Sequence, residues 1–330
     1  MAEFKTSRDI LDGDTADVYF ARTIEILIKE GLNPVVTMEV FSSRAGILCG
    51  IEEVKALLSM ALSNIQGEVW SLNEGEAIDR KEVVLRITAP YQSYGLYETA
   101  ICGILAHCSG WATAARECVE VAGDIPVISF GARHVHPSVA AVMDYSAIIG
   151  GCKSCSSISG ARLAAIEPSG TIPHALVLVM GDTVTATLAF DKHMPPNVPR
   201  ISLVDTFKDE AEESLRVAQA LDNGLDSVRL DTPGERGGVT IDLAREVRAR
   251  LDLAGFKQVK IFVSGGLNVE RIKQFIDKGV PVDGFGVGSY ITSASPIDFT
   301  ADIHEIEGKP VAKRGRIPGI TPNPRLKQFI

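Results

Sequence analysis

In the second half of the chain, short apolar runs alternate with longer segments whose apolar residues recur at helical spacing. Four of the short runs predict β-strands: 201–204, 227–230, 259–263 and 282–285. After the second of these strands, one face of a predicted helix is apolar: Ile241, Ala244, Val247, Leu251 and Ala254. Strands that alternate with helices of this length pair in parallel, and the regular spacing favours a β/α barrel, not necessarily one of eight strands.

The first part of the chain and its last residues follow a different pattern. Between residues 67 and 87, short β-prone runs alternate with turn residues, as in a small sheet with hairpins. Residues 94–122 predict a long helix, which precedes a strand at 125–130. Residues 307–310 predict a hairpin, and a basic, proline-containing tail runs from 313 to 327. The sequence therefore predicts an accessory α/β layer in addition to the barrel.

Length and composition agree with a large domain and a smaller one. A chain of 330 residues exceeds the usual size of a single core, and its 45% hydrophobic and 23% charged residues are typical of globular proteins. The net charge of −9 argues against nonspecific binding to nucleic acid or to an anionic membrane. The longest apolar run, 175–180, is too short to cross a bilayer. We therefore expect a cytoplasmic protein whose ligands are small molecules.

Six cysteines are scattered along the chain, which is unlike the dense pattern of a secreted disulfide scaffold. We expect them to be reduced thiols. Cys152 and Cys155 form a CxxC motif, but no second pair of metal ligands follows, so we do not expect a zinc site there.

Two glycine-rich segments follow consecutive predicted strands. The first glycine loop consists of Ser264, Gly265 and Gly266, and the second contains Gly286, Gly288 and Ser289. Bare backbone N–H groups and the dipole of a following helix favour a bound anion. Either loop alone could be a tight turn, but β/α barrels often bind phosphate in the loops after their last two strands. The pair therefore predicts a site for the phosphate of a sugar phosphate.

Polar residues end two other predicted strands. Asp205 and Asp231 occupy equivalent positions, so their carboxylates should converge at the mouth of the barrel. They could hold Mg²⁺, bond ribose hydroxyls or stabilise a developing positive charge, and capping of the following helices is the alternative. Arg229 points to the same side of its strand as Asp231, and it requires an anionic partner, either that carboxylate or a substrate.

An aromatic ring and a guanidinium follow another predicted strand. Phe130 and Arg133 together suit a planar, anionic ring, and the alternative is a core phenylalanine with a surface arginine. His136 and His174 follow nearby motifs, and each histidine on its own is expected to be structural.

Together these motifs resemble the nicotinate phosphoribosyltransferase family, a branch of the type II phosphoribosyltransferases that includes the nicotinamide and quinolinate enzymes. The resemblance covers nearly the whole chain. It rests on ordered motifs: Tyr97-Glu98-Thr99, Phe130-Gly131-Ala132-Arg133 with His136-Pro137, Gly150-Gly151-Cys152, residues 170–175, 203–206 and 229–231, and the two glycine loops.

The resemblance implies an N-terminal α/β sandwich domain at 1–115 and an incomplete β/α barrel at 116–298. The C-terminal hairpin and basic tail, 299–330, would return to the N-terminal domain. The implied reaction joins nicotinate to the ribose of phosphoribosyl pyrophosphate (PRPP), giving nicotinate mononucleotide and pyrophosphate in NAD salvage. It would use Mg²⁺ and be coupled to ATP hydrolysis.

The same resemblance implies roles for single residues. Phe130 would stack on the pyridine ring, and Arg133 would contact the ring substituent or the pyrophosphate. The glycine loops would hold the ribose 5-phosphate, and Asp205 and Asp231 would hold ribose hydroxyls or Mg²⁺-linked groups. The residues expected to carry catalysis are His174, Asp205, Asp231 and Arg229, and those expected to bind nicotinate and PRPP are Tyr19, Glu98, Phe130, Arg133, His136 and Thr171.

Two of these residues carry further implications. His174 resembles the histidine that ATP phosphorylates in the family. Tyr19 resembles the tyrosine that closes the other face of the ring from the partner subunit, so a homodimer or a larger homo-oligomer is implied.

Other functions compete with this hypothesis. The same fold could act on quinolinate or another ring acid, although two adjacent carboxylates call for more cations than residues 130–136 supply. A barrel phosphosugar isomerase or aldolase would share the phosphate site, but it usually needs a lysine or glutamate base where this chain has Asp205, Asp231 and Arg229. A noncatalytic ligand-binding protein on an enzyme scaffold is the third alternative.

Overall fold

The computed structural model describes residues 4–330, which divide into two compact units. The first unit comprises residues 4–113 together with Ala294–Ile330, and the second is Ala114–Ser293. The resemblance implies domain boundaries after residues 115 and 298, and the two compact units divide after Thr113 and Ser293. Both ends of the chain therefore build one unit.

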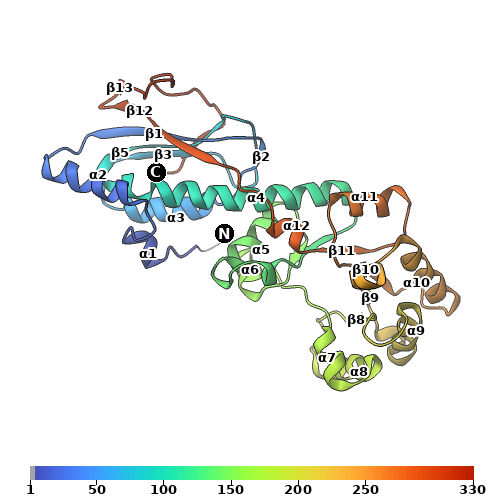
Figure 1. Cartoon of the computed structure of the whole chain (residues 1–330). Coiled ribbons are helices and arrows are strands. Elements are labelled where there is room, and N and C mark those ends of the chain that lie inside the picture. The colour runs from blue at the N-terminus through green and yellow to red at the C-terminus, as the bar shows by residue number, and fades with distance from the viewer. Residues whose placement is uncertain (1–3) are drawn as a thin grey trace. The chain divides into compact units, whose positions relative to one another are not determined.

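The first unit contains an antiparallel sheet of six strands in the order β13-β12-β1-β5-β3-β14 (Figure 1). Its strands are β1 (Val35–Ser42), β3 (Glu68–Ser71), β5 (Val83–Pro90), β12 (Phe299–Ile306), β13 (Lys309–Pro310) and β14 (Lys327–Gln328), and β2 (Gly46–Ile47) pairs separately with β4 (Ala77–Ile78). Its helices are α1 (Arg8–Leu11), α2 (Val18–Lys29), α3 (Ile51–Ala61), η1 (Tyr91–Ser93), η2 (Gly95–Tyr97) and the start of α4 (Glu98–Ala122).

The core of this unit lies where α3 and α4 pack along the sheet (Figure 1). Ile51, Val54 and Leu58 are fully buried and recur at helical spacing, so they form one apolar face of α3. They share a cluster with Val40 of β1 and Leu85 of β5. The predicted accessory α/β layer is confirmed.

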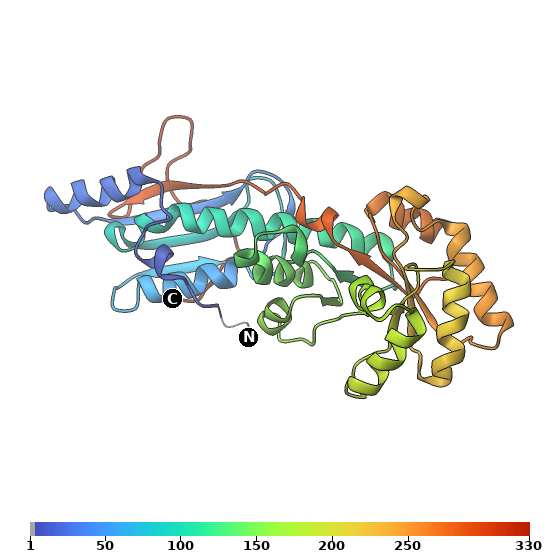
Figure 2. The same ribbon diagram turned by 60° about the horizontal axis from the view of Figure 1, so that its bottom comes forward.

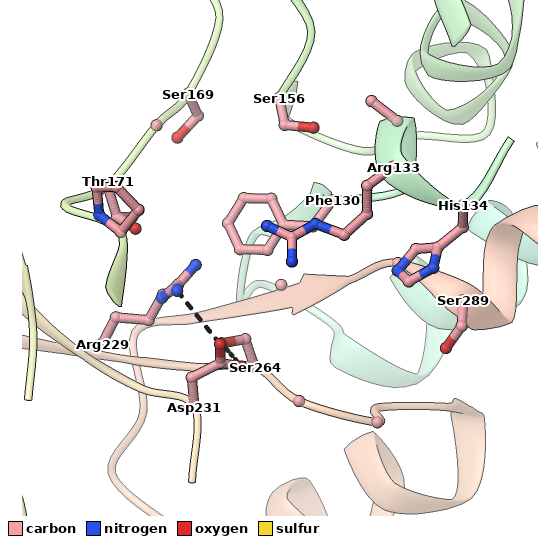
Figure 3. Close-up of a pocket in the computed structure, with 17 residues that line it drawn as sticks. Phe130, Arg133, His134, Ser156, Ser169, Thr171, Arg229, Asp231, Ser264 and Ser289 are labelled. Carbon is pink, nitrogen blue, oxygen red and sulfur yellow. Dashed lines mark hydrogen bonds and ion pairs between the residues drawn. The ribbon is translucent and has the colours of Figure 1, made fainter. Parts of the chain in front are cut away.

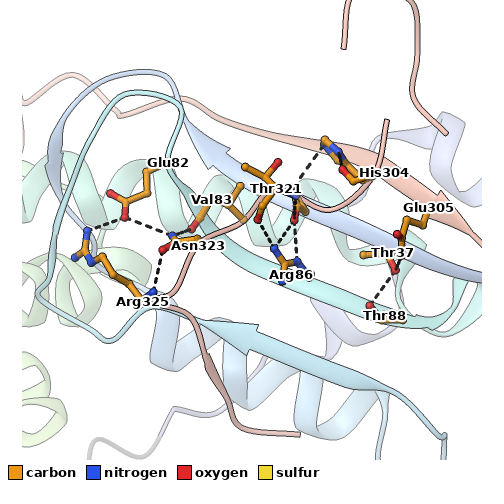
Figure 4. A network of polar contacts seen from close by, with 12 residues as sticks. Thr37, Glu82, Val83, Arg86, Thr88, His304, Glu305, Thr321, Asn323 and Arg325 are labelled. Carbon is orange, nitrogen blue, oxygen red and sulfur yellow. Dashed lines mark hydrogen bonds and ion pairs between the residues drawn. The ribbon is translucent and has the colours of Figure 1, made fainter. Parts of the chain in front are cut away.

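The C-terminal segment is bonded to this sheet at Thr321, which lies beside Arg86 (Figure 4). The Glu39 side chain on β1 is fully buried, and Arg86 Nε of β5 donates to its Oε1 at 2.7 Å. The backbone N–H of Thr321 donates to the same oxygen at 3.1 Å, and the Thr321 carbonyl accepts from Arg86 Nη2 at 2.6 Å. His304 Nε2 lies 3.8 Å from Glu39 Oε2. One charged pair therefore joins β1, β5 and the C-terminal segment.

The second unit contains a parallel sheet of six strands in the order β7-β6-β11-β10-β9-β8. The strands are β6 (Val127–Ser129), β7 (Ser154–Cys155), β8 (Ile201–Leu203), β9 (Ser227–Leu230), β10 (Lys260–Val263) and β11 (Gly284–Val287). The helices are α5 (Ala140–Ile149), α6 (Ile158–Leu163), α7 (His174–Met180), α8 (Thr183–His193), α9 (Glu210–Leu221), α10 (Ile241–Leu253), α11 (Val269–Asp277) and α12 (Ser289–Thr292). Short 3-10 turns are η3 (Ala132–His134), η4 (Pro137–Val139), η5 (Asp222–Gly224) and η6 (Gly234–Arg236).

Strands and helices alternate in this unit, and the gold helices α9 and α10 run alongside the sheet (Figure 2). The four strands predicted from apolar runs correspond to β8, β9, β10 and β11, and Asn268 caps α11 by accepting from the Arg271 N–H at 2.8 Å. The sheet curls without closing, so the predicted fold of an α/β domain plus an incomplete barrel is confirmed. Within residues 4–330, no helix combines the length and the apolar composition required to span a membrane.

The contacts of Glu39 predict that the protein loses much of its stability when Arg86, the cationic partner of Glu39, is replaced. Arg86→Met leaves a buried carboxylate without its ion-pair partner, which costs about 3 kcal/mol in comparable sites. Urea unfolding of the variant followed by circular dichroism should show this loss, and Glu39→Gln in the same chain should recover part of it.

Lys29→Met serves as the matched control, because Lys29 pairs with Glu25 on the exposed surface of α2. Exposed pairs contribute less than about 1 kcal/mol. Equal stability of the Arg86→Met and Lys29→Met variants would contradict the role given to Glu39.

Candidate active site

A cavity of about 550 Å³ opens at the carboxyl ends of the strands of the second unit (Figure 3). Parallel strands bring their carboxyl ends to one edge, so residues that are far apart in sequence meet there. The lining contains many of the residues predicted from the sequence: Phe130, Arg133, Thr171, Arg229, Asp231, Ser264, Gly265, Gly266, Gly286, Gly288 and Ser289. The two glycine loops thus share one cavity.

Glycine is required in both loops. Gly265 and Gly266 have φ angles of +87° and +62°, a region that side chains strongly disfavour. A Cβ atom on Gly286 would lie 2.3 Å from the ring of Phe130, and one on Gly288 would lie 3.0 Å from the Phe130 carbonyl oxygen. The second loop therefore consists of glycine because the end of β6 packs directly against it.

The loops present unused hydrogen-bond donors. Within the described part of the chain, the backbone N–H groups of Gly265, Gly266, Gly288 and Ser289 donate to no protein acceptor. Consecutive free N–H groups next to a helix start form a concave site for an anion. The arrangement fits a phosphoryl group.

An aromatic ring and two arginines form another wall of the cavity (Figure 3). The Arg229 guanidinium carbon lies 5.6 Å from the centre of the Phe130 ring. Burial lowers the pKa of Arg229, with Asp231 opposing the shift, and its Nε makes no hydrogen bond within residues 4–330. Arg133 lines the same cavity and is exposed. This wall suits a flat ligand that carries negative charge.

Asp231 is fixed by its neighbours at the carboxyl end of β9. Its Oδ1 accepts from the Ser264 hydroxyl at 2.8 Å, and its Oδ2 lies 3.3 Å from Arg229 Nη2. The helices that follow are capped by Asp209 and Thr240, so neither Asp205 nor Asp231 serves as a helix cap. The capping alternative is therefore excluded.

His174 lies between the two strand-end aspartates. Its Nε2 is 3.4 Å from Asp205 Oδ2 and 3.9 Å from Asp231 Oδ2, and its Nδ1 is 3.0 Å from the Thr206 hydroxyl. The imidazole is 40% exposed, whereas the Asp205 side chain is fully buried. The three catalytic candidates other than Arg229 thus form one cluster, with His174 accessible to a ligand.

Asp205 carries the most unusual environment of this cluster. Burial raises the pKa of its carboxyl group, while His174 opposes the shift. The approach of His174 lacks hydrogen-bond alignment, so neither carboxylate oxygen of Asp205 has a hydrogen-bond partner within the described chain. Two buried carboxylate oxygens without a partner call for a ligand, a water molecule or a cation next to them.

Asp205 and Asp231 are also the residues expected to hold Mg²⁺. Within residues 4–330, no group of three or more His, Cys, Asp or Glu side chains is placed to hold a metal ion. Mg²⁺ is commonly bound through one or two carboxylates together with substrate phosphates. The partnerless oxygens of Asp205 and the neighbouring Asp231 fit a metal ion that arrives with a phosphorylated substrate.

His174 contacts the lining residue Asp231, but neither His174 nor Asp205 belongs to the lining itself. Three further predicted site residues also lie outside the lining of this cavity. His136 caps η4, where its Nδ1 accepts from the Ser138 N–H at 3.3 Å. Tyr19 and Glu98 belong to the first unit. The hydroxyl of Tyr19 donates to Asp17 Oδ2 at 3.0 Å, and this bond raises the pKa of the phenol. The substrate-binding roles of these three residues stay predictions.

Glu98 lines a separate cavity of about 390 Å³ in the first unit, with Asp302 and Lys313. Burial raises the pKa of Glu98 to about 7, and Asp302 adds to the shift. Lys313 and Arg316 of the basic tail both pair with Asp302, at 2.5 and 2.6 Å.

The CxxC pair also lies apart from the cavity of the second unit. Cys152 and Cys155 are buried, and burial raises the pKa of the Cys155 thiol to about 12 and that of Cys152 further. Both are neutral thiols at physiological pH, which makes them poor nucleophiles and poor metal ligands.

Three residues that the sequence analysis missed line the cavity: His134, Ser156 and Ser169 (Figure 3). His134 follows Arg133 directly, so its position in the motif was a usable signal. Ser156 follows β7, a strand of two residues that has no detectable sequence pattern. Ser169 lies in an irregular segment and gave no signal.

Curated relatives are named for two related activities. The chain is 33% identical over 231 residues to the nicotinate phosphoribosyltransferase pncB2 of Mycobacterium tuberculosis strain H37Rv, covering 69% of this chain and 49% of that protein. It is 27% identical to the human nicotinate-nucleotide pyrophosphorylase [carboxylating], covering 81% of this chain and 82% of that protein. The chain therefore spans about half the length of the first of these relatives.

Two solved structures also resemble this chain. The nicotinate-nucleotide pyrophosphorylase of Pyrococcus furiosus matches with a TM-score of 0.87 and 44% identity, covering 97% of this chain and 82% of that one. Human nicotinic acid phosphoribosyltransferase shares the fold, with a TM-score of 0.75 at 18% identity, covering 92% of this chain and 77% of that one.

Family models extend the match along most of the sequence. Residues 17–109 match the quinolinate phosphoribosyl transferase N-terminal domain, and residues 111–302 match its C-terminal domain. The motif resemblance to the type II phosphoribosyltransferases is confirmed, although the matching models carry the quinolinate rather than the nicotinate name. The chain belongs to the quinolinate phosphoribosyltransferase family.

Proposed function

We propose that this chain is a phosphoribosyltransferase that joins nicotinate to PRPP, giving nicotinate mononucleotide and pyrophosphate in NAD salvage. One observation carries the proposal: a single cavity combines the Phe130 ring, flanked by Arg229 and Arg133, with the two glycine loops. The first element suits a pyridine acid and the second suits a ribose phosphate. The names of the relatives from M. tuberculosis and Bacillus subtilis support the same substrate.

The choice of nicotinate over quinolinate rests on charge. Arg229 already faces Asp231 at 3.3 Å, which leaves Arg133 as the arginine of this lining without a carboxylate partner. One free guanidinium matches the single carboxylate of nicotinate, whereas quinolinate carries two adjacent carboxylates. Quinolinate is the second candidate, because the family models and the P. furiosus neighbour favour that branch.

The geometry suggests how the transfer proceeds. Pyrophosphate leaves C1 of the ribose as the ring nitrogen attacks, so positive charge develops at the sugar. The carboxylates of Asp205 and Asp231 would face that charge while the arginines and the glycine loops hold the phosphates. Asp205 and Asp231 would hold Mg²⁺, and the ion would supply positive charge to neutralise the leaving group. Orientation and charge account for catalysis without an enzyme nucleophile.

ATP coupling is a further part of the proposal, and it depends on His174. This imidazole is exposed enough to meet a nucleotide, and Asp205 and Asp231 face its Nε2. Carboxylates stabilise the protonated nitrogen of a ring whose other nitrogen accepts a phosphoryl group. We propose that ATP phosphorylates His174 and that hydrolysis of the phosphohistidine drives synthesis.

The substrate is tested by incubating the purified protein with PRPP and Mg²⁺ and with nicotinate, nicotinamide or quinolinate in turn. The mononucleotide product should form fastest with nicotinate, because one carboxylate matches one unpaired arginine. Chromatographic quantification of the nucleotide measures the three rates. Faster turnover of quinolinate would assign the chain to the second candidate function.

Asp231→Asn should lower turnover roughly a hundredfold or more, because it removes a charge that faces the reacting sugar. The amide oxygen can still accept from Ser264, so the loop geometry is retained. Asp209→Asn is the control, since Asp209 only caps α9 and asparagine caps equally well. Steady-state rates at saturating substrates measure the effect, and equal rates for both variants would remove Asp231 from catalysis.

His174→Ala should abolish the stimulation of synthesis by ATP and leave a slow reaction that needs no ATP. The ratio of rates with and without ATP measures this. His193→Ala, in the exposed last turn of α8, should keep the ratio of the parent protein. Stimulation that survives in His174→Ala would show that His174 is not the phosphorylated residue.

A further inference from the structure

His134 forms part of the cavity wall next to the second glycine loop, yet no motif assigns it a role. The backbone fixes its position: the Phe130 N–H donates to the Val287 carbonyl at 2.8 Å, and the His134 N–H donates to the Gly131 carbonyl at 2.8 Å. The turn η3 is therefore anchored to the end of β11, from which the second glycine loop begins.

The imidazole lies directly against that loop. A Cβ atom on Gly288 would be 3.2 Å from both Nε2 and Cδ2 of His134. In Figure 3 the His134 ring and the Ser289 side chain lie on the same side of the cavity. A side chain at position 288 would crowd the imidazole, so the ring edge and the loop backbone form one surface.

This surface presents donors that have no protein acceptor. Within residues 4–330, the ring nitrogens of His134 make no hydrogen bond or ion pair, and neither does the Ser289 hydroxyl. The N–H groups of Gly288 and Ser289 are likewise unused. A cluster of donors without internal acceptors suits an anion with several oxygens, such as a phosphoryl group.

The charged groups on the surrounding elements do not compete for His134. On α5, Asp144 accepts from the Ser129 hydroxyl and the Ser157 N–H. Near α12, Glu117 accepts from the Tyr290 hydroxyl. Across the cavity, Asp231 is bonded to Ser264 and Arg229.

Arg133, on the same turn as His134, is a cation that lines the cavity together with Arg229. The local balance of charge therefore favours an anionic ligand.

We infer that His134 is a ligand for the 5-phosphate of PRPP, acting beside the second glycine loop. This inference rests on the proposed function, because it names a residue that binds the proposed substrate. A protonated imidazole gives a charge-assisted bond and donates from both nitrogens, whereas the neutral ring donates from one.

The test compares His134→Ala, His134→Arg and the parent protein in steady-state kinetics. His134→Ala should raise the KM for PRPP roughly 10- to 100-fold, the range expected for loss of a charged hydrogen bond. Its kcat at saturating PRPP should stay within a few-fold of the parent, and His134→Arg should restore the KM. His193→Ala is the control for loss of an exposed histidine and should leave the KM unchanged.

The two variants separate binding from a merely structural role. Arginine supplies a cationic donor in place of the imidazole, so a merely structural role would leave His134→Arg as impaired as His134→Ala.

Direct binding of ribose 5-phosphate, measured by calorimetry, gives a readout that needs no turnover. Affinity should fall in His134→Ala and recover in His134→Arg. Unchanged affinity in His134→Ala, no recovery of affinity in His134→Arg, or a larger loss in His136→Ala would each overturn the inference. A parent protein that binds ribose 5-phosphate but forms no nucleotide with any ring acid would instead overturn the proposed function.

Discussion

The close approach of the end of β6 to the end of β11 is the constraint on which the rest of the site depends. A Cβ atom on Gly286 would lie 2.3 Å from the Phe130 ring, and one on Gly288 would make a tight contact of 3.0 Å with the Phe130 carbonyl oxygen. The flat wall of the cavity and the glycine wall therefore exist only together. Since the two strands are neighbours in a parallel sheet, a hydrogen bond from Phe130 to Val287 continues their pairing beyond the strands. The sheet itself fixes the spacing between the two halves of the ligand site.

Opposite charges meet at the strand ends. Arg229 lies 5.6 Å from the centre of the Phe130 ring and also contacts Asp231, which directly follows the same strand. The carboxylates of Asp205 and Asp231 gather around His174 at the ends of β8 and β9, and the Ser264 hydroxyl donates to Asp231. A ligand with phosphates at one end and a positively charged sugar carbon in its middle would find cations for its phosphates and carboxylates for that carbon.

Much of this arrangement could be predicted from the sequence, because the direction of parallel strands fixes where strand-end residues go. Once 201–204, 227–230 and 259–263 were recognised as strands, Asp205, Asp231 and Ser264 had to share one edge. The contact between His174 and Thr206 could not be predicted, since it depends on the path of an irregular segment before α7. Whether His134 or His136 reaches the cavity depends on a single 3-10 turn, η3. A turn of this length has no periodic sequence pattern, so the sequence could not show which histidine faces the cavity. The positions of first-unit residues such as Tyr19 depend on tertiary packing, which a local sequence pattern does not reveal.

The anchoring of the chain end to Glu39 has a consequence for biosynthesis. Glu39 and Thr321 are 282 residues apart, and β12 supplies the neighbour of β1 only after every strand of the second unit has been made. At roughly 5–20 residues per second, a ribosome takes tens of seconds to cover that interval. During that time the second unit can assemble while β1 keeps one edge unpaired, and unpaired edges attract other chains. The nascent polypeptide is thus most exposed to aggregation at the part of the protein that was synthesised first.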